Sequence, residues 1–157
     1  MAGAAVEIDD REVVAALRRL QQAGSRLRPA LLEIGEYLLQ STEARFDAQV
    51  DPAGQPWTPL SPAYQARKKK NPNLILVLTG HLSGQQAPQA GQRAGLQAPQ
   101  ATETAVSVGT NLVYAATHQF GRPEQNIPAR PFLGLNATDT REILTIINEH
   151  FERAARG

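Results

Sequence analysis

Cysteine is absent from the 157 residues, which excludes disulfides and thiolate metal sites. Neither sign of charge dominates, because 16 Lys and Arg stand against 15 Asp and Glu, and no overall field attracts the chain to nucleic acid or membrane. No apolar run approaches the ~20 residues of a membrane helix. The first residues also lack the basic start and apolar core of a signal peptide. We therefore expect a soluble protein that is assembled in a reducing compartment.

Motifs for nucleophilic or metal chemistry are scarce as well. The three histidines, His81, His118 and His150, have no second ligand at a spacing that suggests a metal, so surface or packing roles fit them better. The stretch "GHLSG" around Ser83 reads G-x-x-S-G and not the G-x-S-x-G of a nucleophile elbow. A triad of Ser83, His118 and Asp139 can be written down, but nothing else supports it.

Two further patterns have ordinary explanations. Glu33 and Glu36 lie one helical turn apart, which is typical of a solvated helix stripe. Gly91 and Gly95 lie in a glutamine-rich stretch and not between a strand and a helix, so they do not form a phosphate loop. We predict a protein that is not an enzyme and has no cofactor and no metal.

The N-terminal third reads as two helices. Asp9 or Asp10 can cap the first, and apolar residues then recur at steps of three and four. Pro29 suits the first turn of a second helix, so we place a break between Ser25 and Arg28. The second helix is predicted to turn four apolar residues toward the core: Leu31, Ile34, Leu38 and Phe46.

The stretch "VDPAGQPWTPLSPAY" breaks the helical periodicity. Residues 51–54 form a predicted turn, because proline presets φ and Gly54 accepts a left-handed conformation. Trp57, the single tryptophan, is predicted to anchor this loop against the helices. Ser61 followed by a proline indicates the start of a short helix, which we expect to continue through "RKKK" and to stop before residue 71.

The middle of the chain favours strands. Residues 73–79 form an apolar run that reads as a strand buried on both faces. Residues 84–102 are rich in Gln, Ala, Gly and Pro, and are predicted to be a flexible loop or a loosely formed hairpin. In the next predicted strand, residues 103–108, Thr104, Val106 and Val108 alternate inward.

The C-terminal part contains a short helix, an extended segment and a long helix. Asn111 can cap a helix that ends at Gly121, and "IPARPFLGL" is extended because residues before proline avoid the helical region. Thr138 or Asp139 is predicted to open the last helix, with four apolar residues on its inner face: Ile143, Ile146, Ile147 and Phe151. The order predicts one α+β domain over residues 1–157, with a small, mostly antiparallel sheet packed against N-terminal helices and a C-terminal helix.

The charge run Arg67–Lys70 has two readings. It can be a solvated helix end, where cations complement the helix dipole, or a site that contacts phosphate groups. No recognition-helix pattern supports sequence-specific DNA binding.

Arg130 lies in a stiff segment, because Pro128 and Pro131 fix two φ angles. A stiff extended segment loses little entropy on association, and arginine is enriched at interface hot spots. One reading therefore places Arg130 at an interface with another protein molecule. The other reading pairs it with a local carboxylate.

Four stretches together resemble the phage virion morphogenesis family, the tail completion proteins of tailed bacteriophages. They occur in this order from residue 45 to residue 135: "RFDAQVDPAGQPWTPLSPAY" with Pro-x-Gly-x-x-Trp-x-Pro-Leu, "LILVLTGHL" with Leu-Thr-Gly-x-Leu, "VSVGTNLVYAATHQFG" with Val-Gly-Thr-Asn and His-Gln-Phe-Gly, and "IPARPFLGL". The terminal helices match in type and position. Residues 84–102 are richer in Gln and Ala than the family pattern.

The resemblance implies a non-enzymatic virion component of the tail or neck, assembled in the host cytoplasm. It implies a homo-oligomeric ring, often a hexamer, around the DNA channel, next to the tail tube or tail terminator and the head–tail connector, with no membrane partner. An assembly factor absent from the finished particle and a DNA-binding regulator are the alternatives. The hypothetical interface residues are Tyr114, His118, Phe120, Arg122, Arg130 and Phe132, and the hypothetical residues for non-specific contact with DNA are Arg67, Lys68, Lys69 and Lys70.

Overall fold

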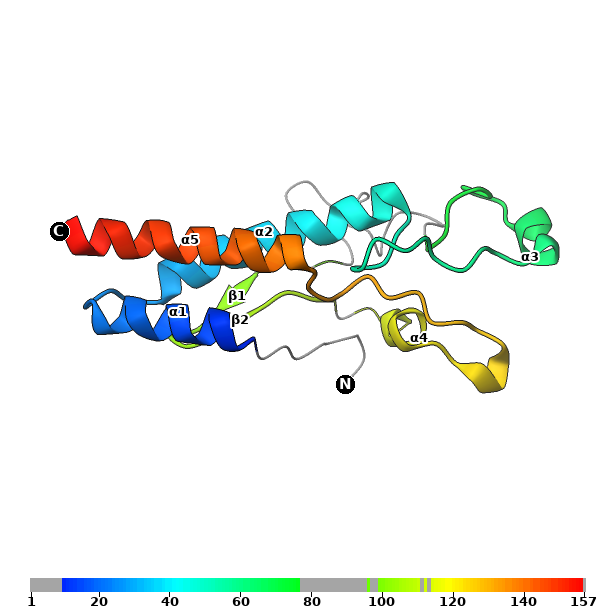
Figure 1. Ribbon diagram of the computed structural model, residues 1–157. Helices are drawn as coiled ribbons and strands as arrows, with labels where there is room; N and C mark the ends of the chain where they lie inside the picture. The colour runs from blue at the N-terminus through cyan, green and yellow to red at the C-terminus, as the bar shows by residue number, and fades with distance from the viewer. Residues whose placement is uncertain (1–9, 77–95, 97–98, 111, 113, 157) are drawn as a thin grey trace. The chain divides into compact units, whose positions relative to one another are not determined.

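The computed structural model describes residues 10–76, 96, 99–110, 112 and 114–156. Its described elements confirm the predicted α+β class, with helices in the majority and one antiparallel pair of strands (Figure 1). In chain order they are α1 (Arg11–Gln22), α2 (Arg28–Ala48), α3 (Pro62–Arg67), β1 (Gln100–Ala101), β2 (Val106–Ser107), α4 (Ala115–Phe120), the 3-10 helix η1 (Pro123–Gln125) and α5 (Ala137–Arg156).

The described residues fall into two compact units. Unit 1 comprises those within 42–98 and 109–134, and unit 2 comprises those within 10–41, 99–108 and 135–156. The division lies within α2, whose residues up to Ser41 belong to unit 2.

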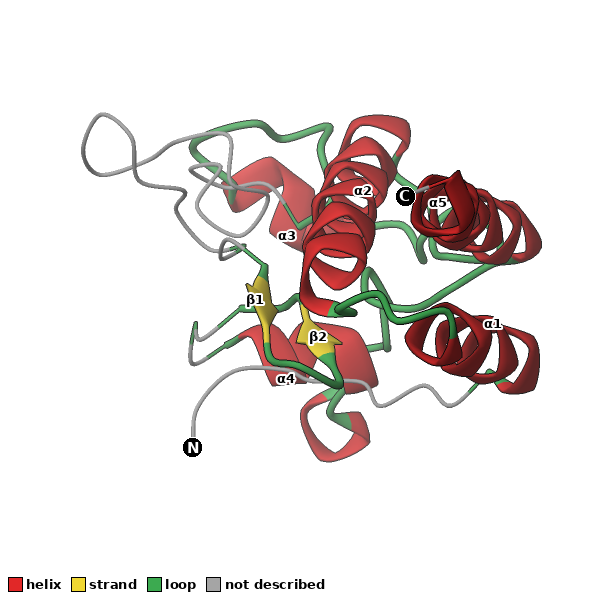
Figure 2. Cartoon of the chain, turned by 90° about the vertical axis from the view of Figure 1, so that its left-hand side faces the viewer, coloured by secondary structure: helices red, strands yellow, loops and turns green. Residues whose placement is uncertain are grey.

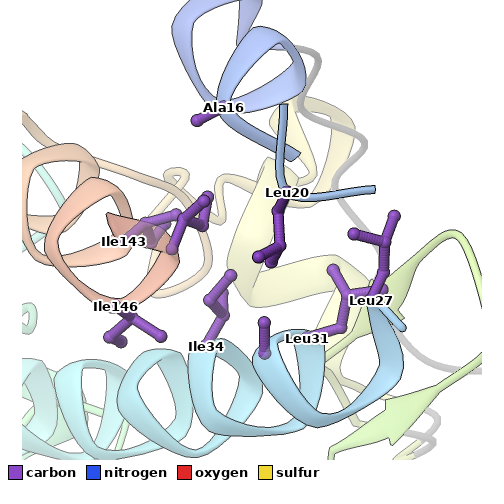
Figure 3. Close-up of a cluster of buried hydrophobic side chains, with 9 residues drawn as sticks. Ala16, Leu20, Leu27, Leu31, Ile34, Ile143 and Ile146 are labelled. Atoms are coloured by element: carbon purple, nitrogen blue, oxygen red, sulfur yellow. The ribbon is translucent and has the colours of Figure 1, made fainter. Parts of the chain in front are cut away.

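Unit 2 is built around an apolar core between α1, α2 and α5. Asp10 caps α1 by accepting a hydrogen bond from the Val13 amide at 3.0 Å, as predicted. The chain then reverses at Gly24, whose φ of 85° favours glycine, and α2 begins at Arg28, so the predicted break is confirmed. Figure 3 shows the side chains of the three helices meeting in a core of nine residues: Ala16, Leu20, Leu27, Ala30, Leu31, Ile34, Ile143, Ile146 and Ile147.

The first turn of α5 is closed by a reciprocal pair of hydrogen bonds. The side chain of Asn136 accepts from the Asp139 amide at 2.8 Å, and the Asp139 carboxylate accepts from the Asn136 amide at 3.1 Å. This arrangement is a capping box. The helix therefore begins earlier than predicted, because Asn136 and not Thr138 is its cap.

Phe151 corrects the predicted inner face of α5. Its side chain is 37% exposed, whereas Ile143 and Ile147 are each 2% exposed. Ala154, one turn further along α5, packs against the core, whereas Phe151 does not belong to the cluster.

A short hairpin also belongs to unit 2. Gln100 pairs with Ser107 and Ala101 with Val106, next to α2 (Figure 2). The contact with α2 requires Gly35, since a Cβ there would lie 2.5 Å from the Pro99 side chain. Two residues of the predicted loop 84–102 are thus strand β1, while 84–95 and 97–98 lie outside the described residues.

The hairpin turn corrects the predicted strand at residues 103–108. The Thr102 hydroxyl oxygen accepts from the amides of Thr104 and Ala105, which holds these residues in a turn. Thr104 is consequently exposed and not inward, and the strand is limited to Val106–Ser107.

In unit 1 the predicted strand at residues 73–79 is wrong for its described part. Residues 73–76 form turns, and 77–79 lie outside the described residues. Leu76, inside the predicted strand, has a φ of 59°, which an extended strand cannot contain. The Gln49 side chain takes the place of a strand partner, because its amide donates to the Ile75 carbonyl at 3.0 Å and its oxygen accepts from the Ile75 amide.

Three local predictions in unit 1 are confirmed. The Gly54 amide donates to the Asp51 carbonyl at 3.0 Å and closes the predicted turn. Ser61 caps α3 by accepting from the Tyr64 amide at 3.2 Å. Helix α4 ends at Gly121, with a φ of 76°.

Two helix limits in unit 1 differ from the prediction. The N-cap of α4 is Tyr114, which makes no side-chain capping bond, and Asn111 lies outside the described residues. Helix α3 ends at Arg67 because Lys68 adopts an extended conformation.

Candidate interaction surface

The extended segment, residues 128–133, is the best-anchored part of unit 1. It makes no strand ladder with another segment in the described part of the chain. Buried backbone groups nevertheless need hydrogen-bond partners. Side chains from three other stretches supply them, and these side chains are those of Arg45, Trp57 and Gln119.

Gln119 of α4 satisfies three backbone groups at once. Its carbonyl oxygen accepts from the amides of Phe132 and Leu133, both at 3.0 Å, and its amide group donates to the Leu133 carbonyl at 3.0 Å. The side chain is 6% exposed. A single glutamine thus replaces the hydrogen bonds that a neighbouring strand would make.

An aromatic cluster supports the same segment. Phe46 of α2 packs edge-on against Trp57 with ring centroids 5.4 Å apart, and against Phe132 at 5.5 Å. Trp57 donates from Nε1 to the Pro131 carbonyl at 2.7 Å, and Arg45 donates to the Phe132 carbonyl at 2.9 Å. Trp57 therefore anchors its loop, as predicted, and also holds the extended segment.

Arg130 is used inside the subunit. Its guanidinium donates from Nε to the Thr58 carbonyl at 2.7 Å and from Nη2 to the Pro59 carbonyl at 3.1 Å, while its own amide donates to the His118 carbonyl at 2.7 Å. The side chain is 7% exposed, and burial lowers its pKa. These acceptors are backbone carbonyls, so Arg130 neither points outward nor depends on the carboxylate that the alternative reading supposed.

The burial of the six candidate interface residues divides them. Phe132 and Arg130 are buried and cannot present a surface in this conformation. Phe120 and Tyr114 are 58% and 45% exposed, and Arg122 is exposed. The outward-facing aromatic groups of this region therefore belong to α4 and its N-cap, and not to the extended segment.

His118 lies between these two sets. Its ring meets the Tyr114 ring edge-on at 6.0 Å, and its Nδ1 atom is buried with no hydrogen-bond partner in the described structure. Burial lowers the pKa of His118, and the positive charge of Arg130 lowers it further. The ring is consequently neutral near pH 7.

A tight turn connects α4 to the extended segment. A Cβ at position 121 would lie 2.7 Å from the Ala129 nitrogen, so only glycine fits there. Arg122 and Ile127 then exchange two backbone hydrogen bonds, at 2.8 and 3.1 Å, and Arg122 pairs with Glu124 at 3.5 Å. The turn fixes the position of Phe120 relative to the buried residues below it.

The charge run separates into one inward and three outward cations. Lys68 is half-buried and donates from Nζ to the carbonyls of Asn71, at 2.7 Å, and Leu74. Burial lowers its pKa. Arg67, Lys69 and Lys70 are exposed.

The remaining chemical candidates have structural roles or lie outside the described residues. Asp139 is 1% exposed and accepts from Tyr37 and Ser41, both at 2.8 Å, in addition to its capping bond. His150 pairs with Glu33 at 2.7 Å. No group of three metal-ligating side chains occurs among the described residues. The other candidates, Ser83, His81, Gly91 and Gly95, lie outside the described residues.

These features define an α+β chain with outward aromatic groups on a hydrogen-bonded scaffold. The chain belongs to the phage virion morphogenesis family, whose model matches residues 8–152, and it therefore has a role in phage morphogenesis. No solved structure shows a significant match. In the part that the structure describes, no helix is long and apolar enough to span a membrane.

Three relatives illustrate the similarity. The chain is 32% identical over 162 residues to "Putative capsid assembly protein G" of Escherichia phage Mu, covering 96% of each chain. It is 29% identical over 153 residues to "Mu-like prophage FluMu G protein 2" of Haemophilus influenzae, covering 94% of this chain and 95% of that protein. An uncharacterized protein of Methanocaldococcus jannaschii is 38% identical over 77 residues, 49% of this chain and 53% of the relative.

Proposed function

We propose that this chain is a structural virion protein that completes the phage tail or joins it to the head, as one subunit of an oligomeric ring around the DNA channel. Family membership supports this role, and so does the similarity to a phage Mu protein named for capsid assembly. The chain acts without catalysis, a cofactor or a membrane. Its partners are further copies of itself, the tail tube or tail terminator, and the head–tail connector, and it resides in the tail or neck of the virion.

The observation that carries this proposal is the exposure of Phe120 on a rigid scaffold. Phe120 is 58% exposed, and its apolar surface is removed from water only when another molecule covers it. The Gly121 turn and the bonds from Gln119 fix the backbone on either side, so little ordering is needed on association. A ring needs one surface that fits a different surface of the next copy, and Phe120 with Tyr114 provides the first of these.

Substitution of Phe120 by glutamate tests the proposal. A charge at an exposed position leaves the fold intact, but its burial in a contact is unfavourable, so Phe120→Glu should reduce the oligomer mass measured by light scattering. The matched control is Phe151→Glu, which changes another exposed aromatic residue, on α5, and should leave the mass unchanged. Equal masses for wild type and Phe120→Glu would contradict the proposed surface.

The alternative function is an assembly factor that leaves before the particle is complete. Both roles require oligomer contacts, so mass spectrometry of purified virions distinguishes them. The structural role predicts that this chain is present at a fixed number of copies per particle, and the alternative predicts that it is missing.

A further inference from the structure

Helix α3 contributes nothing to the core of unit 1. All six of its residues, Pro62 to Arg67, are exposed, and Tyr64 is 43% exposed. A helix of six residues is far below the ~12–15 residues at which isolated helices become marginally stable in water. Its position must therefore come from the chain on either side.

Helix α3 lies within residues 58–75, a segment that we name the arm. Hydrogen bonds anchor the arm at both of its ends. At the start, Arg130 holds the carbonyls of Thr58 and Pro59. At the end, Gln49 bonds both backbone groups of Ile75. Within the arm, Lys68 closes the turn that follows α3. The arm is thus positioned by hydrogen bonds and not by packing.

The exposed charge of the arm has one sign. Arg67, Lys69 and Lys70 face solvent, and the arm contains no carboxylate. The absence extends much further, since there is no Asp or Glu from Pro52 to Thr102, although an even spread of the 15 carboxylates would place about five there. The helix dipole explains cations in the last turn of α3, but not the lack of acidic residues over so long a stretch. Contact with a polyanion would explain that lack, because acidic groups there would repel it.

We propose that the arm contacts the phosphate backbone of double-stranded DNA through Arg67, Lys69 and Lys70, and that Arg130 is the residue that positions it. The proposal rests on the ring function above, which brings the subunit close to DNA. DNA fits better than an acidic protein, because a protein interface needs an apolar centre, and the exposed large apolar side chains of the arm are Tyr64 and Leu74 alone. Exposed cations without a reading helix contact phosphates and do not select a sequence.

Fluorescence anisotropy with a short labelled duplex at several salt concentrations tests the contact. Changing Arg67, Lys69 and Lys70 together to Gln should weaken binding and flatten the slope of log K against log salt by up to about 2.7 per arm, because each phosphate contact contributes about 0.9. The charge-matched control changes three exposed arginines of α1, Arg11, Arg18 and Arg19, to Gln and should leave the slope unchanged. Equal slopes for all three proteins would overturn the contact.

Two neighbouring single variants sharpen the test. Lys68→Gln and Lys69→Gln each remove one positive charge, one residue apart. Lys69→Gln should flatten the slope by about 0.9, whereas Lys68→Gln should not, since Lys68 is bound to carbonyls within the arm. If both variants act equally, the arm is only a diffuse charge and the assignment of three contacts is wrong.

The role of Arg130 has a separate readout. Arg130→Lys keeps the charge but cannot donate to two carbonyls in the same fork, so the arm should become mobile. Trypsin should then cut at the arm sooner than in the wild type, and the salt slope should flatten although every cation of the arm is retained. Unchanged cleavage and slope would remove Arg130 as the positioning residue.

Two parallel measurements keep the outcomes distinct. Light scattering shows whether the wild type and each variant form an oligomer. If the wild type does not form one, the ring is refuted. If the triple variant forms a normal oligomer and its salt slope equals that of the wild type, only the DNA contact of the arm is refuted. Labelled polyglutamate replaces the duplex in a second titration. If polyglutamate binds the arm as tightly as DNA at the same salt, an acidic protein is the partner and the DNA proposal fails.

Discussion

The two units of this chain satisfy their interiors in different ways. Unit 2 buries nine apolar residues between three helices and has one buried polar residue among its described positions, Asp139. Unit 1 has five such polar residues: Thr42, Arg45, Thr110, Gln119 and Arg130. Three of these, Arg45, Gln119 and Arg130, bond to backbone groups far away in the sequence. A helix satisfies its own backbone hydrogen bonds, whereas an extended segment without a strand partner needs side chains from elsewhere as hydrogen-bond partners.

The difference teaches how each unit should respond to mutation. An apolar core tolerates exchanges that conserve volume, because its contacts are non-directional. A hydrogen-bonded scaffold does not, because a lost partner leaves a buried group unsatisfied.

The largest contrast should come from two exchanges to leucine. Gln119→Leu keeps a similar size but leaves the amides of Phe132 and Leu133 and the Leu133 carbonyl without hydrogen-bond partners. The free energy of unfolding of unit 1 should therefore fall by about 3 kcal/mol. Ile147→Leu in unit 2 should cost less than about 1.5 kcal/mol. Urea unfolding followed by circular dichroism and Trp57 fluorescence measures both, and equal losses would abolish the contrast between the units.

A smaller effect is expected in unit 2 at high pH. Burial, and then the hydrogen bond to Asp139, raise the pKa of Tyr37 from its usual value of 10.0 to about 12. The folded state therefore holds this proton more tightly, and its contribution to stability is complete below pH 10 and disappears as the pH rises through about 12. Tyr37→Phe should remove this part of the alkaline loss in urea unfolding. Burial also raises the pKa of Tyr114 in unit 1, so only the difference between wild type and variant is informative.

The smallest expected effect lies in unit 1 at low pH. Because burial and Arg130 lower the pKa of His118, the unfolded chain binds this proton more readily. Stability is therefore complete above about pH 6.5 and falls as the pH drops below that value. Trp57, the single tryptophan, lies in unit 1 and reports the change by fluorescence. His118→Gln should flatten the acidic limb, and an identical pH profile would show that His118 does not set it.

Sequence reasoning succeeded where a signal is local. The Asp10 and Ser61 caps, the Gly54 turn and the end of α4 at Gly121 each depend on residues within a few positions. The apolar periodicity of α2 and α5 also identified five of the nine core residues of unit 2, because the period of the helix is encoded in the sequence itself. They are Leu31, Ile34, Ile143, Ile146 and Ile147.

The failures have a common physical cause. Residues 73–76 read as a strand because they are apolar, but the bonding partner is Gln49, 26 positions earlier. The two readings of Arg130, an interface contact and a local carboxylate, both miss its acceptors, which lie 71 and 72 positions away. Phe120 and Tyr114 are exposed and Phe132 is buried, a difference that the sequence does not reveal.

The loop Pro123–Asn126 is closed at its base by the Arg122–Ile127 pair, and all four of its residues are exposed. Asn126 occupies the left-handed region at the end of η1. The hydrogen bonds that close the base belong to Arg122 and Ile127, so they do not depend on the side chains of the loop. A short epitope or a single fluorophore placed after Gln125 would sit a few residues from Phe120 while leaving the Gln119 bonds intact. This loop is therefore a suitable labelling site for following the association of subunits.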